Sequence, residues 1–444
     1  MKHLFLILPF LLSFTHYSQE NETINLKSAI EFGLENHLSI KKTILELEKV
    51  KQQKKETQGI GLPQVNAEGS FNHFLNLPVQ VLSASFFNPF APEDEIIAFR
   101  AGTKFNTNAA LQINQLLFNG SYIVGLDFSK FLIEMQQDFI EQSKEEVVYQ
   151  IKLAYHSAAI LKENLNFLDS ISQITKETFE QQKKLLELGL ISQEELDQLE
   201  FLFINAEKNH QSSIIQYKNS ILALKISMQY PLENKLEISE NINDLVKKNA
   251  LPKGSLENNL NLRLLKNQEK LTGYDIKNNQ AAKYPSFSAS FQQAYNAYRN
   301  DFDFFADKPW YPQTIWSVKM GIPIYSGGQK NAKIQQSKIK LLKNKNETEQ
   351  LEYNLKAQEI QLKRDYQNSL LQLELQNKNI ILAEKIYKNA IIKKEIGKVN
   401  NITITQLYNQ LIGAKAAHNI AHMDVLKTKL NIEKLYNQLY NTTK

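Results

Sequence analysis

The stretch Leu117-Phe118-Asn119-Gly120 is matched in the second half of the chain by Tyr325-Ser326-Gly327-Gly328. Each stretch is followed by a long helical pattern that ends at another glycine, Gly189 in the first half and Gly397 in the second. In each half, the glycine before the helical pattern and the glycine that ends it are 69 positions apart: Gly120 and Gly189 in the first, Gly328 and Gly397 in the second. Equal spacing of matched motifs is the sequence signature of an internal repeat. We therefore expect one architecture built from two similar halves.

Two further motif pairs lie upstream at a common offset of 222 residues. Glu35-Asn36-His37-Leu38-Ser39-Ile40 is matched by Glu257-Asn258-Asn259-Leu260-Asn261-Leu262, and Leu62-Pro63-Gln64-Val65 is matched by Tyr284-Pro285-Ser286-Phe287. The repeat therefore extends over most of the chain. We predict a first repeat at 19–228, a linker at 229–255 and a second repeat at 256–444.

The composition excludes several classes of protein. The chain has 444 residues and no cysteine, which excludes disulfides, thiol catalysis, Cys-ligated zinc and a lipid anchor on an N-terminal cysteine. The formal net charge of +5 is small and is spread along the chain, so no basic block indicates nucleic-acid binding. Lys2 and His3 precede an apolar run from Leu4 to Phe14, which predicts a signal peptide at 1–18 and export from the cytoplasm.

The hydrophobic period changes twice in each predicted repeat, from helix to strand and back. In the first repeat we expect a helix at 26–60, strands within 64–118, a long helix at 121–188 and a helix at 192–228. In the second we expect a helix at 256–283, strands within 285–325, a long helix at 329–395 and a helix at 400–440. The predicted fold class is a mainly helical mixed α/β membrane protein with four strands per chain.

The clearest strand pattern runs from Thr103 to Leu117, where apolar and polar residues alternate. Phe105, Thr107, Ala109, Leu111, Ile113 and Leu117 form the apolar set, and Lys104, Asn106, Asn108, Gln112 and Asn114 form the polar set. Strands of this length can cross an outer membrane when tilted. Four strands alone would leave two open edges, which is costly in lipid. Closure demands several chains, and three chains would give a twelve-stranded barrel.

The long helices show narrow apolar seams typical of coiled coils. In the first, apolar residues step by four and three: Val147, Ile151, Ala154, Ala158, Leu161, Leu165 and Leu168. In the second, the corresponding seam is Tyr366, Leu370, Leu373, Asn377, Ile380, Glu384, Tyr387 and Ile391. A narrow apolar seam with polar residues on the other faces indicates a wall of helices with water on both sides. A solid helical bundle would require a wider apolar face.

Taken together, these motifs resemble the TolC-type outer membrane efflux proteins over essentially the whole mature chain. The resemblance is carried by the duplicated helix–strand–strand–helix order, by Pro63 and Pro285 before the strands, and by the turns at Gly189 and Gly397. It implies a homotrimer in the cell outer membrane, with a transmembrane β-barrel and a long coiled-coil helical barrel in the periplasm. It also implies two partners, a periplasmic adaptor of the membrane-fusion type and an inner-membrane pump.

The resemblance implies a periplasmic tip at the two glycine turns. Residues expected to dock the adaptor are Gly189, Leu190, Ser192, Gly397, Lys398 and Val399. Residues expected at the tip constriction are Glu195, Thr403, Gln406 and Lys394. Glu195 suits a salt link to Lys394 or Lys398, although it is equally a first-turn acid favoured by the helix dipole. Thr403 and Gln406 stand where some relatives have aspartates, so an acidic cation-binding ring from this hairpin is not expected.

Two groups of aromatic residues near the predicted strands are open to more than one interpretation. Trp310, Tyr311 and Trp316, together with Phe302, Phe304 and Phe305, are interpreted as a membrane aromatic belt at a barrel rim, and the alternative is a packed extracellular loop. The Phe-rich insertion at 75–100 could plug the outer mouth or pack against it.

We expect no enzyme, because the chain has no Ser-His-Asp order, phosphate loop or paired-carboxylate motif. His418 and His422 have a spacing that can hold zinc, but without a third ligand we expect a solvated helix face and no metal or cofactor. The predicted function is passive conduction through the exit duct of a tripartite efflux or type I secretion system. Multidrug export is one activity of such systems. The alternative is a secreted or surface coiled-coil structural protein without channel activity. The sequence does not identify the cargo.

Overall fold

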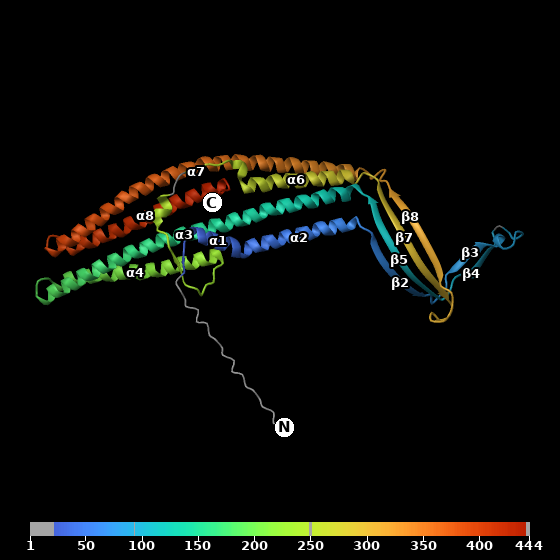
Figure 1. The fold of residues 1–444 in the computed structure, drawn as a ribbon, viewed down its shortest axis with the longest axis horizontal. Coiled ribbons are helices and arrows are strands. Elements are labelled where there is room, and N and C mark those ends of the chain that lie inside the picture. Colours follow the sequence, from blue (N-terminus) through green and yellow to red (C-terminus); the bar gives the residue numbers. More distant parts are fainter. Residues whose placement is uncertain (1–21, 93, 248–250, 441–444) are drawn as a thin grey trace, which may run out of the picture. The chain divides into compact units, whose positions relative to one another are not determined.

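The computed structural model describes residues 22–92, 94–247 and 251–440 (Figure 1). The predicted signal peptide at 1–18 lies outside these residues. The first half contains β1 (Glu22–Ile24), α1 (Leu26–Asn36), α2 (Leu38–Ile60), β2 (Gln64–His73), β3 (Val79–Ser83), β4 (Ile96–Arg100), β5 (Phe105–Phe118), α3 (Gly120–Glu187) and α4 (Gln193–Met228). The second half contains β6 (Leu236–Ile238), α5 (Ile242–Lys247), α6 (Leu260–Ala281), β7 (Ser286–Arg299), β8 (Tyr311–Gly321), α7 (Gln329–Glu395) and α8 (Asn401–Leu435).

These elements form two compact units, which we call the helical unit and the sheet unit. The helical unit comprises residues up to Leu45, Asp138–Leu264 and Thr348 onward, and the sheet unit comprises Glu46–Gln137 and Leu265–Glu347. The mainly helical fold with four long strands confirms the predicted fold class. The trimer and the twofold repeat that were part of that prediction remain to be tested.

The first helix of each predicted repeat is interrupted where the sequence predicted continuity. His37 and Asn259 both have extended backbone, so α2 and α6 begin at the residues that follow them. The side chain of each caps the next helix: the Ser39 amide donates to His37 Nδ1 at 3.2 Å, and the Leu262 amide donates to Asn259 Oδ1 at 3.2 Å. The motif pair at 35–40 and 257–262 therefore encodes a capped helix break. Apolar periodicity alone does not reveal it.

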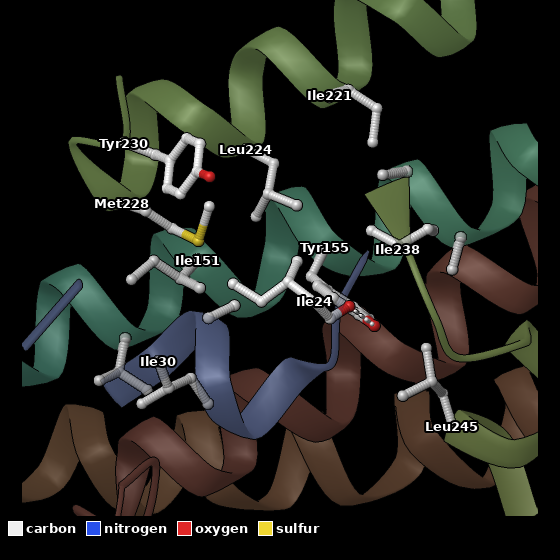
Figure 2. Close-up of a cluster of buried hydrophobic side chains, with 14 of the residues drawn as sticks. Ile24, Ile30, Ile151, Tyr155, Ile221, Leu224, Met228, Tyr230, Ile238 and Leu245 are labelled. Atoms are coloured by element: carbon white, nitrogen blue, oxygen red, sulfur yellow. Dashed lines mark hydrogen bonds between the residues drawn. The ribbon is translucent and has the colours of Figure 1, made fainter. Parts of the chain in front are cut away.

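The linker predicted at 229–255 is not structureless. It contains β6, which pairs in parallel with β1, and the short helix α5. Figure 2 shows Ile24 of β1 and Ile238 of β6 in the main hydrophobic cluster of the helical unit, which also contains Ile151 and Leu224. The Tyr155 hydroxyl donates to the Ile24 carbonyl oxygen at 3.1 Å, so the buried phenol is satisfied.

The buried face of α3 is wider than the predicted seam. Val147, Ile151 and Ala158 are buried as expected, but Lys152 and His156 are buried with them, although they lie off the seam. Lys152 Nζ forms an ion pair with Glu433 Oε2 of α8 at 2.9 Å, and both side chains are only 7% exposed. The expectation of a narrow seam with wetted faces on either side is therefore wrong for this part of α3, because packing covers it on more than one face.

His418 and His422 also differ from expectation, because both are buried and neither lies on a solvated face. His418 Nε2 lies 2.6 Å from Asn377 Oδ1 of α7 and 3.2 Å from His422 Nε2. Burial lowers the pKa of both rings, and that of His422 falls to about 4, with Lys415 and the neighbouring His418 adding to the effect and Glu163 opposing it. The pair is a neutral, hydrogen-bonded contact inside the helical unit. The described residues contain no group of three or more His, Asp or Glu side chains placed to hold a metal ion.

The buried histidines predict a loss of stability on acidification. The pKa of His156 falls to about 3, mainly because the ring is buried. In the unfolded chain a histidine takes up its proton near its ordinary pKa of about 6.5. Below that pH the unfolded chain binds more protons at these histidines, so their contribution to stability is constant above about pH 6.5 and falls as the pH approaches 4. Between the unfolded and the folded pKa, each such histidine should lower the free energy of unfolding by roughly 1.4 kcal/mol per pH unit. Glu145 acts in the opposite direction, because burial raises its pKa to about 7 and the folded state takes up that proton first.

Denaturant unfolding of the helical signal between pH 7.5 and 4.5 measures this effect. His422→Leu should give a flatter profile than the parent chain, because it removes one of the neutral rings. A profile as steep as that of the parent chain would contradict the assignment of His422 as buried and neutral.

Candidate functional site

The sheet unit contains a four-stranded antiparallel sheet in the order β2-β5-β7-β8 (Figure 1). β5 and β7 come from the two different halves of the sequence and lie side by side at the centre. β2 and β8 are the outer strands, and within the part of the chain that the structure describes each is paired on one side only. The sheet therefore has two open edges.

One face of this sheet is predominantly apolar. The register places Val65, Ile113, Phe291 and Trp316 in one row across all four strands. Because alternate residues of a strand share a face, the positions two residues on either side lie on the same face. This apolar face comprises Val65, Ala67, Phe71, Phe105, Ala109, Leu111, Ile113, Phe287, Ala289, Phe291, Tyr295, Trp316, Val318 and Met320.

The opposite face is polar, and its side chains hydrogen-bond between strands. Asn108 Nδ2 donates to Asn296 Oδ1 at 2.8 Å between β5 and β7. The hydroxyls of Ser290 and Ser317 are 2.7 Å apart between β7 and β8. A sheet with one apolar and one polar face can separate a lipid phase from water.

The structure divides the predicted aromatic belt. Trp316 lies on the apolar face and is exposed, as a lipid-facing residue would be in a single chain. Tyr311 lies five residues away and therefore on the polar face, where its ring is 6.1 Å from that of Tyr298. Trp310 precedes β8 in the connection from β7. The three residues therefore do not share one face, and the belt assignment stays a prediction only for Trp316.

Two of the phenylalanines assigned to the belt, Phe302 and Phe304, form an aromatic cluster on the apolar face. Phe302 and Phe304, from the β7–β8 connection, lie edge-on to Phe71 of β2 at 5.9 and 5.6 Å between ring centroids. Phe105 of β5 joins them. These rings come from distant parts of the sequence, and only the strand register shows that they meet.

In the helical unit, Gly189 and Gly397 end α3 and α7 with left-handed backbone, at φ values of 70° and 72°. The Leu190 amide donates to the Leu185 carbonyl oxygen and the Lys398 amide to the Lys393 carbonyl oxygen, each at 2.9 Å. Both turns therefore have the Schellman arrangement, in which a residue with positive φ returns the last amides to the helix. This accounts for glycine at both positions. Leu190 and Lys398 are exposed beside them, whereas Val399 packs against a buried cluster.

The substitution Gly189→Ala is expected to destabilise the turn. No atom lies within 4 Å of an added Cβ at this position, so the cost is conformational and should be about 1 kcal/mol. Gly413 is the matched control, because it is also surrounded by open space but lies inside α8. Gly413→Ala should stabilise the protein by about 0.5–1 kcal/mol, since alanine is the better helix former. Chemical denaturation measures both, and shifts of the same sign would refute the argument.

Helices α3 and α4 form one helical hairpin around Gly189, and α7 and α8 form another around Gly397. The second helix of each hairpin begins with a side-chain cap. Ser192 and Glu195 form a capping box at the start of α4: the Glu195 amide donates to Ser192 Oγ at 3.2 Å, and Glu195 Oε2 accepts from the Ser192 amide at 3.3 Å. At α8, Asn400 Oδ1 accepts from the amide and the hydroxyl of Thr403. Among the described ion pairs none joins Glu195 to Lys394 or Lys398, so the expected salt link is absent here. The carboxylate is used within its own helix.

Asn401 connects the two hairpins near their turns. Its Nδ2 donates to the Glu195 carbonyl oxygen at 2.6 Å, and its side chain is buried. Leu199 and Ile404 are fully buried in the adjoining cluster. A hydrogen bond and an apolar cluster therefore join α4 and α8 next to the two turns, and the assignment of this region as a periplasmic tip stays a prediction.

A groove of about 520 Å³ lies beside this tip between α4 and α8. It is lined by Glu194, Asp197, Gln198, Phe201, Ile402, Thr405 and the predicted constriction residue Gln406. Phe201 and Ile402 are 63% and 57% exposed, so the groove presents two large apolar side chains next to carboxylates. The sequence analysis missed them because each looks like an ordinary apolar residue of a helix.

No helix in the described part of the chain combines the length and the apolar character needed to cross a membrane.

Comparison with known proteins supports one class of protein, the outer membrane efflux proteins. The family model described as Outer membrane efflux protein matches residues 251–438. Comparison with the curated proteins gives no significant match. The predicted resemblance to this family is confirmed, with the sequence match lying in the second half of the chain.

Several solved outer membrane proteins have the same fold. The CmeC outer membrane channel of Campylobacter jejuni has a TM-score of 0.69 at 15% identity, covering 93% of this chain and 85% of that one. The MtrE outer membrane channel of Neisseria gonorrhoeae, in its open state, has a TM-score of 0.66 at 15% identity, covering 94% and 90%. VceC, an outer membrane protein of Vibrio cholerae, has a TM-score of 0.63 at 12% identity, covering 94% and 95%.

The family description and the shared fold support an efflux channel of the outer membrane with a long helical extension, as predicted. The matching family is one of transport proteins and not of enzymes.

Proposed function

We propose that the chain is the outer-membrane exit duct of a tripartite efflux or type I secretion system, and that it works as a homotrimer. The observation that carries this proposal is the four-stranded sheet with one apolar face, one polar face and two open edges. In lipid, the unpaired backbone groups of β2 and β8 would cost several kcal/mol each. Pairing β2 of one copy with β8 of the next removes both edges, and three copies give twelve strands.

Conduction through such a ring is passive. The apolar face containing Phe291 and Trp316 would contact lipid, and the polar face containing Asn108 and Asn296 would line a water-filled bore. The bore offers amides and hydroxyls and few charges, so it gives little basis for selecting a cargo. Selection would then lie with an inner-membrane pump, which also supplies the energy.

The tip is the proposed docking site for a periplasmic adaptor. Its turn residues Leu190 and Lys398 are exposed, and each lies four residues before a residue that lines the groove, Glu194 and Ile402. Exposed apolar side chains flanked by carboxylates suit a helical partner with apolar anchors and basic neighbours. Glu195, Lys394, Thr403 and Gln406 stay proposed as constriction residues, although Glu195 would have to leave its capping box to act there.

Site-specific photo-cross-linking in cells tests the docking proposal. A photoreactive amino acid at Leu190 should capture a periplasmic adaptor, identified by mass spectrometry. The same amino acid at Ile215, an exposed position of α4 far along the helix from the turn, is the control. Capture of an adaptor at Ile215 and not at Leu190 would refute docking at the tip.

The alternative, a coiled-coil structural protein without channel activity, receives little support. It provides no reason for an exposed sheet with an apolar face, and the family match is to efflux proteins.

A further inference from the structure

The insertion between β2 and β5 forms a separate hairpin, β3–β4, in which Val79 pairs with Arg100 and Ser83 with Ile96. It leaves the sheet where β2 ends and β5 begins, which is the opposite end from the α2–β2 and β5–α3 junctions. In the sheet unit, Figure 1 shows this hairpin projecting beyond the ends of the four long strands. Among the described residues it pairs with no other strand.

The hairpin carries apolar side chains on both faces; one face is well exposed and the other is half-buried, with Ile97 and Phe99 37% and 38% exposed. Alternation places Val79, Val81 and Ile96 on one face and Leu82, Ile97 and Phe99 on the other. The tip adds Phe86, Phe87 and Phe90, whose exposed fractions are 77%, 59% and 95%. Phe87 lies edge-on to both Phe86 and Phe99. The side chains that stay more than half exposed include Val79, Val81, Ile96, Phe86 and Phe90.

Such a hairpin needs a partner on each side. A two-stranded hairpin alone is marginally stable in water, and a contiguous apolar surface of this kind marks an interaction site. Lipid is a poor partner, because it would leave the free edges of β3 and β4 without hydrogen bonds. It would also draw the exposed carboxylates of Asp94 and Glu95 toward the hydrocarbon. Protein can cover both faces and still satisfy the backbone.

We propose that this hairpin packs against the same hairpin of neighbouring copies and closes the outer end of the channel as an aromatic cap. This inference rests on the proposed function, since it requires a closed ring of chains. In a ring each hairpin has two neighbours, one for each apolar face, and the Phe90 side chains converge toward the symmetry axis. The hairpin adjoins β2, an open edge where a neighbouring copy would pair, so the cap continues that interface.

The natural absence of cysteine makes the test direct. Phe90→Cys and Phe86→Cys, both at the tip that faces the axis, are each treated with a short bis-maleimide in outer-membrane preparations. Three cysteines around an axis can link only in pairs, so dimers should reach at most about two thirds of the chains. Val318→Cys, exposed on the apolar face of β8, is the matched control and should not cross-link.

The cross-linked membranes are then extracted with detergent, and light scattering measures whether the particles are assembled or monomeric. This distinguishes failure of the cap from failure of the proposed channel. Assembled particles with cross-linking at Phe90→Cys or Phe86→Cys support the cap. Assembled particles without cross-linking at either position overturn the cap and leave the proposed function intact. Quenching of a fluorophore on Phe90→Cys by a lipid-borne quencher, without cross-links, would show that the occupant is lipid and also overturns it. Monomeric particles would refute both proposals.

Discussion

Phe291→Lys is expected to prevent stable insertion into the outer membrane, whereas Gln292→Lys, one residue further along β7, is expected to be tolerated. Phe291 lies in the row that contains Ile113 and Trp316, near the middle of the apolar face. A lysine facing lipid at the bilayer midplane costs about 2–4 kcal/mol. Gln292 lies on the polar face, where a lysine would remain in water.

The two substitutions add the same charge to the same strand, so each serves as control for the other. The measurement is the fraction of chain recovered in the outer-membrane fraction in a folded, protease-resistant form. Equal recovery of the two variants would contradict the assignment of faces. Failure of Gln292→Lys alone would mean that the faces are assigned the wrong way round.

Glu433→Ala is expected to lower the free energy of unfolding of the helical unit by about 3–5 kcal/mol, the usual cost of removing one partner from a buried ion pair. Lys152 and Glu433 link α3 to α8 at 2.9 Å, and both are almost fully enclosed. Without the carboxylate, the Lys152 ammonium would remain buried beside His156, whose pKa is already lowered by burial and by Lys152. Denaturant unfolding measures the loss.

The double substitution Lys152→Met with Glu433→Leu should recover most of that stability. A buried ion pair replaced by apolar residues of similar size is often neutral or stabilising, because desolvation of both charges is avoided. If Glu433→Ala were as stable as the parent chain, the pair would have to be solvated in solution, against the burial seen here.

The order of the long elements follows from the sequence because their signals are local and repeated. Alternation over a dozen residues indicates a strand, and glycine after a long helical pattern indicates a left-handed cap, as found at Gly189 and Gly397. Apolar periodicity does not indicate the helix breaks at His37 and Asn259, and the capping role of their side chains is seen only in the structure. The division into repeats at 19–228 and 256–444 stays a prediction.

The candidate site was harder to predict because it depends on contacts between distant segments. Alternation within β5 identifies an apolar face, but only the pairing of four strands shows that Tyr311 and Trp316 are on opposite faces. Likewise, Asn401 and Glu195 meet only because α4 and α8 pack together. Burial of Lys152, His418 and His422 was missed because polar residues were assigned to solvent, whereas paired or neutral polar groups can be enclosed.

Electron microscopy of the detergent-extracted, signal-cleaved protein tests the central claim most directly. The account predicts particles of three copies around an axis, with a continuous bore through a closed β-barrel and a helical extension. Monomeric particles, or oligomers in which β2 and β8 remain unpaired, would contradict a channel built from this sheet. They would return the chain to the coiled-coil structural alternative.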